Sequence, residues 1–192
     1  ITFAVLVVSF YAGFLVEEYK MSSSFSGWLI SLFFLAIVVP GFFINHIIGV
    51  LKGWSNIASL AMMAIGLLLF GLGKSTGAMV IGSLLAGFGY GIMQPIIYDK
   101  AAIIAPPHLA TLALSYVMAA NYLAIVVCPF IIEGFRDIFH TKSELFPFIL
   151  NGVILAIMFA VALFARRNWT LGLDESYYSK PDNSTQDRAG NA

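Results

Sequence analysis

Long apolar runs alternate along the chain with short polar connections. Six such runs occupy most of its length. Most of them reach the ~20 residues that a helix needs to cross about 30 Å of hydrocarbon. Helices are favoured over strands because the runs are long and unbroken and lack an alternation with period two. The predicted spans are 1–16, 25–50, 54–72, 78–98, 109–132 and 145–165.

Charged residues mark the ends of these runs, and no Asp, Glu, Lys or Arg falls in the middle of one. If both chain ends lie on one side of the membrane, the lysines and arginines near the helix ends divide evenly between the two sides. The positive-inside rule therefore gives no orientation. One side holds Lys52, Lys100, Arg166 and Arg167, and the other holds Lys20, Lys74, Arg136 and Lys142. Residues 168–192 are polar, and we expect a disordered tail there.

Composition supports a membrane protein. Hydrophobic residues make up 60% of the chain and charged residues 10%, whereas soluble domains have about 45–50% and about 25%. The fold class predicted is an all-α membrane protein, a bundle of six transmembrane helices over 1–167. The net charge of +0 gives no sign of a nucleic-acid partner. A single cysteine excludes an internal disulfide, and no motif for an enzyme, a metal or a cofactor is present.

The segment 82–100, GSLLAGFGYGIMQPIIYDK, is unusually rich in glycine. It does not match a phosphate-binding loop, because GxGxxG and GK[ST] are both absent and no strand precedes it. On a helix, one face would hold Ser83, Gly87, Tyr90, Gly91, Gln94 and Tyr98, and the opposite face Gly82, Ala86, Gly89 and Met93. The small residues favour close helix packing, and Pro95 predicts a kink. The polar face either contacts a substrate or is part of the same packing.

Other polar side chains within the runs are few. An unpaired amide in hydrocarbon costs several kcal/mol, so Asn121 either bonds a neighbouring helix or lines a wet cavity, with Tyr122 beside it. Tyr11 lies in an aromatic stretch that faces lipid or a cavity wall. His46 could relay protons near neutral pH, or it could be a solvated residue at a helix end.

Three features of the second half occur in a familiar order: glycines with Pro95, a Pro106-Pro107 turn, and a run that Pro129 closes. This order resembles the tenth and eleventh helices of major facilitator superfamily transporters. The resemblance extends to about Arg167. It implies that the six runs are helices seven to twelve and that the C-terminal tail is cytoplasmic. It also implies that the first, second, fourth and fifth runs face a central cavity, with the other two peripheral.

One loop departs from the family pattern. Many members carry G-x-L-x-D-R-x-G-R-R after their second and eighth helices. The corresponding region here is GVLKGWSNIA, in which Lys52 is the only charge. The cytoplasmic latch that this loop usually provides is therefore not expected in this half.

The leading hypothesis is the C-terminal domain of a secondary transporter, a proton-coupled exporter of drug-like or other organic solutes, in the bacterial inner membrane. Ile1 begins inside an apolar run, so we expect a fragment whose missing N-terminal six-helix half is its partner, together with the lipid bilayer, a small organic substrate and protons. The candidates for the substrate path are Tyr90, Gln94, Tyr98, Asn121, Tyr122 and Tyr11. Alternatives are nutrient or metabolite uptake by the same fold, and a six-helix scaffold without a substrate path.

Overall fold

The computed structural model describes residues 1–164, except for the side chains of Lys52 and Pro107. Over these residues the secondary structure is helical. This confirms the predicted fold class. Five of the helices are long and apolar enough to cross a membrane, and α1 falls just below that length. The elements in order are α1 (Thr2–Glu18), α2 (Ser23–Leu51), η1 (Lys52–Trp54), α3 (Ser55–Leu72), α4 (Thr76–Ile104), η2 (Pro107–Leu109), α5 (Ala110–Phe139) and α6 (Phe146–Phe164). The predicted tail, 168–192, lies outside the described residues.

Helices α3 and α4 form the centre of the bundle. A Cβ on Gly82 of α4 would lie 2.6 Å from the carbonyl oxygen of Gly66 in α3, so the two backbones touch where neither has a side chain. On its other side, α3 packs against α6, where the rings of Phe70 and Phe148 stack with centroids 5.0 Å apart. Helix α4 is therefore fixed against α3 on one face, and its other faces remain for contacts with α1, α2 and α5.

The first half of α4 also packs tightly against α2. Gly87 lies under the backbone of Phe33, where a Cβ would be 2.5 Å from the carbonyl oxygen. Ser83 is buried and donates a hydrogen bond to the carbonyl of Leu29 at 3.0 Å. Gly91 approaches the backbone of Ile37 in the same way. Ser83, Gly87 and Gly91, which the helical pattern grouped with the polar face, therefore lie against α2.

Helices α4 and α5 extend beyond the predicted spans. The sequence predicts that both spans end before the first charged residue. Instead, α4 continues through Asp99 and Lys100, and α5 continues through Glu133 and Arg136. Backbone hydrogen bonds continue where a helix leaves the hydrocarbon, so a charge does not end a helix. Pro129 does not close α5 as expected but lies inside it, since transmembrane helices tolerate proline when neighbouring groups satisfy the freed carbonyl.

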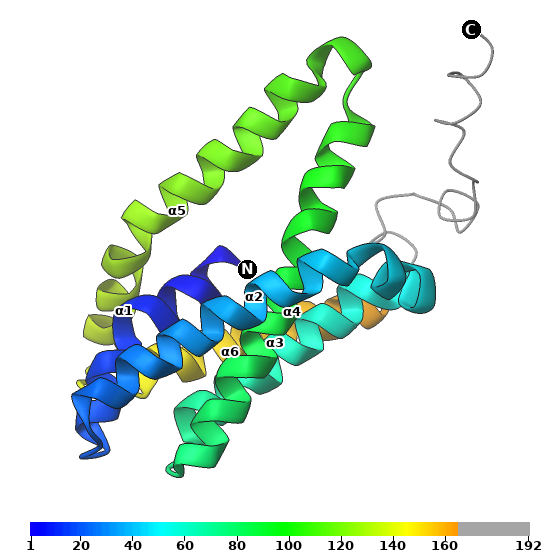
Figure 1. Ribbon diagram of the computed structural model, residues 1–192. Coiled ribbons are helices and arrows are strands. Elements are labelled where there is room, and N and C mark those ends of the chain that lie inside the picture. The colour runs from blue at the N-terminus through cyan, green and yellow to red at the C-terminus, as the bar shows by residue number, and fades with distance from the viewer. Residues whose placement is uncertain (165–192) are drawn as a thin grey trace, which may run out of the picture.

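The second half of α4 and most of α5 diverge from the rest of the bundle. They meet at the turn that contains η2, and the start of α1 lies between their lower parts (Figure 1). Ala105 is extended just before Pro106, as the residue before a proline prefers. Gln94 and Tyr98, which follow Gly91 on α4, lie on the side of the helix that faces α1 and α5.

Candidate functional site

A pocket of about 210 Å³ lies between the start of α1, the second half of α4 and the middle of α5. Helix α4 contributes only side chains with a polar group, whereas α1 and α5 contribute both polar and apolar ones. The lining residues are Thr2, Val5, Leu6, Tyr90, Gln94, Tyr98, Met118, Asn121, Tyr122 and Ile125. None of these described lining residues carries a formal charge.

Asn121 is the centre of a hydrogen-bonded network in this pocket. Its Oδ1 accepts from the Thr2 hydroxyl at 2.5 Å, and its Nδ2 donates to the Tyr98 hydroxyl at 2.9 Å. Gln94 donates through Nε2 to the same Tyr98 oxygen, one helical turn away. Tyr90 lines the same pocket as Thr2. The amide of Asn121 therefore joins three helices and also borders the pocket.

The structure brings together five of the six residues predicted for the substrate path. Tyr90, Gln94, Tyr98, Asn121 and Tyr122 all line the one pocket. Their role in transport stays a prediction. The two interpretations of Asn121, glue between helices and lining of a cavity, describe the same side chain, since it does both.

Tyr11 and His46 lie elsewhere. Tyr11 is buried on α1 two and a half turns from Thr2, and its hydroxyl faces Glu133 of α5. His46 is exposed on α2 and does not line the pocket. Thr2 is the polar pocket residue that the sequence did not reveal. It is one threonine at the start of an apolar run, and its partner Asn121 is 119 positions away.

A second polar network, with charges, joins α1 to α5 and to the connection before α6. The guanidinium of Arg136 contacts the carboxylates of Glu133 at 3.1 Å and Glu144 at 2.6 Å. Its Nη2 also donates to the carbonyl of Ser143 at 3.1 Å. It lies over the ring of Tyr11, 5.6 Å from the centroid. The Arg136 side chain is only 12% exposed. We call these residues, with Glu18, the Arg136 network.

Glu18 connects the end of α1 to the same network. One carboxylate oxygen accepts from the backbone N–H of Glu144 at 2.7 Å, and the other accepts from the Ser143 hydroxyl at 3.2 Å. The short segment before α6 is therefore held from α1 by Glu18 and from α5 by Arg136. Arg136 is the cation for Glu133 and Glu144, and this network contributes no residue to the pocket around Asn121.

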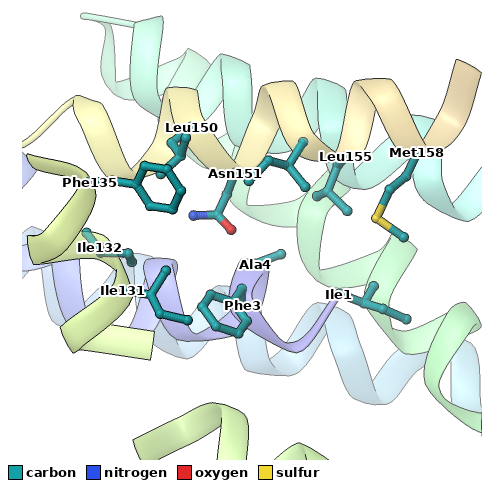
Figure 2. Close-up of a pocket in the computed structure, with 11 residues that line it drawn as sticks. Ile1, Phe3, Ala4, Ile131, Ile132, Phe135, Leu150, Asn151, Leu155 and Met158 are labelled. Atoms are coloured by element: carbon teal, nitrogen blue, oxygen red, sulfur yellow. The ribbon is translucent and has the colours of Figure 1, made fainter. Parts of the chain in front are cut away.

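A further cavity of about 240 Å³ lies between α1, α5 and α6 (Figure 2). Its walls are apolar except for Asn151, whose Nδ2 donates to the carbonyl of Pro147 within α6 at 2.9 Å. This cavity therefore offers a ligand the polar groups of one side chain, whereas several polar side chains converge on the pocket around Asn121. Among the described residues, no group of three or more His, Cys, Asp or Glu could hold a metal ion.

Comparison with known proteins identifies one match. The family model described as Major Facilitator Superfamily matches residues 1–186, which is nearly the whole chain. Neither the curated proteins nor the solved structures gave a match.

Proposed function

The chain belongs to the Major Facilitator Superfamily of membrane transporters, and we propose that the pocket around Asn121 is part of its substrate path. The observation that supports this is the hydrogen-bonded network of Thr2, Tyr98 and Asn121, which borders a pocket of about 210 Å³. Concave sites with apolar walls and a few converging polar groups are where proteins most often bind small molecules. Three helices meet there, so small rotations of any one of them would change the pocket.

We further propose that a second six-helix half completes this path. In the most apolar stretch of each helix, 61% of the residues of α3 are buried, against 22% for α2 and 11% for α5. These two helices therefore have faces left over for lipid or another protein surface. A second bundle that packs against α2 and α5 would cover them and close the pocket from the opposite side, as alternating access between two bundles requires.

For direction and coupling, we propose export of organic solutes against an inward flow of protons. The lining of the pocket contains no carboxylate or histidine, so the coupling proton would bind outside it, in the second half or elsewhere in the chain. Uptake of a nutrient through the same path would leave the geometry unchanged and differ only in direction.

The test uses the complete natural polypeptide in liposomes of known orientation with an imposed pH gradient. A trapped pH dye reports proton movement when neutral, anionic and cationic aromatic solutes are added in turn. We expect at least one solute to dissipate the gradient, and the double variant Asn121→Ala, Gln94→Ala to lose this response while its melting temperature stays close to that of the natural protein. Asn45→Ala, at an exposed position outside the pocket, is the control.

Each part of the proposal has its own contrary result. Unchanged transport by the double variant would exclude the pocket as the path. Solute movement without proton movement would exclude proton coupling. Transport only toward the cytoplasmic side would replace export by uptake.

A further inference from the structure

The polar groups of the Asn121 pocket are all uncharged. Two amides, three phenols and an aliphatic hydroxyl line it, from Asn121, Gln94, Tyr90, Tyr98, Tyr122 and Thr2. The neighbouring Arg136 network carries charges, but none of its residues lines the pocket. An ionised ligand group placed against this wall would lose water and find no counter-charge, which is strongly unfavourable.

Counting hydrogen bonds shows which capacity remains for a ligand. The Tyr98 oxygen already accepts from Gln94 and from Asn121, so its own O–H is left as a donor. Gln94 donates through Nε2 and keeps its carbonyl oxygen as an acceptor. Among the described residues, nothing pairs with either of these two groups. One donor and one acceptor therefore border the pocket side by side, a pattern that matches a hydroxyl or a primary amide.

The rest of the wall suits an aromatic or aliphatic ring. Val5, Leu6 and Ile125 are apolar, and Met118 adds a polarisable sulfur that packs well against rings. A cavity of about 150 Å³ accommodates benzene. The 210 Å³ measured here therefore accommodates one ring with a polar substituent.

We propose that this pocket binds uncharged aromatic solutes through a hydroxyl or amide group that pairs with Tyr98 and Gln94. The inference rests on the proposed function, because it assigns a substrate class to the same path. It follows that this pocket disfavours anions and cations alike and does not prefer one of the two. A site built to pair with a hydroxyl or amide also discriminates strongly against ligands that lack the group.

The direct test is binding of three compounds that share a phenol ring and differ in one substituent. These are 4-hydroxybenzamide, which is neutral, 4-hydroxybenzoate, which is an anion, and 4-hydroxybenzylamine, which is a cation at neutral pH. Titration calorimetry on the purified complete polypeptide should give the amide a Kd lower than that of either ion by roughly tenfold or more. Equal or tighter binding of either ion, or no binding of the amide at its solubility limit, overturns the proposal.

Isosteric variants that add charge provide the second test. Asn121→Asp places a carboxylate in the pocket, so we expect the order to invert and 4-hydroxybenzylamine to bind best. Gln94→Glu should shift the order in the same direction if Asn121→Asp does not fold. Asn45→Asp makes the same change at an exposed position outside the pocket and should leave the order as it is. An unchanged order in both pocket variants contradicts the inference.

Liposome transport of the same three compounds separates this inference from the proposed function. If an ion is carried by a route that Asn121→Ala abolishes, the pocket is the path and the substrate class is wrong. If Asn121→Ala abolishes transport of none of the carried compounds, the pocket is not the path and both proposals fail.

Discussion

Two polar networks hold α1 against α5, and they differ in charge. Around Asn121, neutral amides and hydroxyls hydrogen-bond one another, leave a donor and an acceptor unused, and border a pocket. Around Arg136, one guanidinium is paired with the carboxylates of Glu133 and Glu144, and Glu18 of α1 adds hydrogen bonds to the same segment. The difference indicates that the two networks serve different purposes. Paired charges favour one fixed arrangement, whereas a neutral network with spare capacity can exchange its partners for those of a ligand.

The largest expected effect on stability is that of Arg136→Ala. It leaves Glu133 and Glu144 without their cation, and the Arg136 side chain is 12% exposed. We expect the free energy of unfolding to fall by about 2 kcal/mol, less than for a fully buried pair because Glu133 is half exposed. Denaturant titration of the complete polypeptide measures this. Arg136→Lys should lie between, since lysine keeps the charge without the planar fork. If Arg136→Ala lowered the free energy of unfolding by less than Asn121→Ala does, the neutral network would contribute more to stability than the charged one, which contradicts the expectation.

The link from α1 to the same network should be weaker. Glu18→Ala removes a carboxylate that accepts from Glu144 N–H and from Ser143. Because Glu18 is exposed, we expect a loss of about 0.5–1 kcal/mol in unfolding free energy. Glu17→Ala is the matched control, an exposed acidic neighbour on the same helix. Equal losses in the two variants would contradict this expectation. They would show that the effect comes from the charge near the helix end and not from the contacts of Glu18.

The sequence predicted the helices well because length and apolarity alone decide a membrane span. It predicted the shared face of Tyr90, Gln94 and Tyr98 from a local period of 3.6 residues. It did not predict which residues of that face pack against α2 and which line the pocket, since this depends on where α2 separates from α4. The aromatic stretch around Tyr11 suggests a cavity wall, whereas its hydroxyl faces Glu133, 122 positions away, which the local pattern does not predict.

Helix ends were harder to predict than helices. The charges of Glu133 and Arg136 predict the end of the fifth span, yet the helix continues past them to Phe139. A charged side chain ends an apolar run without interrupting backbone hydrogen bonds. The Arg136 network consequently has no signature in the sequence: its members belong to α1, to α5 and to the connection before α6, and only the fold brings them together.

The neutral network should contribute less to stability. Thr2→Val and Asn121→Leu remove the two ends of the 2.5 Å hydrogen bond. A double-mutant cycle should give a coupling free energy of about 0.6 kcal/mol, the average for such bonds between transmembrane helices. Transport should nevertheless fall far more in these variants than in Glu18→Ala. If coupling exceeds the loss in Arg136→Ala, the Asn121 network is a structural clamp and the distinction between the two networks does not hold.

The smallest change in stability is expected for Tyr98→Phe. The ring stays in place, and the donors of Gln94 and Asn121 that lose their acceptor border a pocket that water can enter. We expect a change of about 0.3 kcal/mol in unfolding free energy, together with roughly tenfold weaker binding of 4-hydroxybenzamide, because the free O–H of Tyr98 is gone. Tyr116→Phe, exposed on α5 outside the pocket, should change neither quantity. A large stability loss with unchanged binding would assign Tyr98 to holding the helices together, and the neutral network would then resemble the charged one in purpose as well as in position.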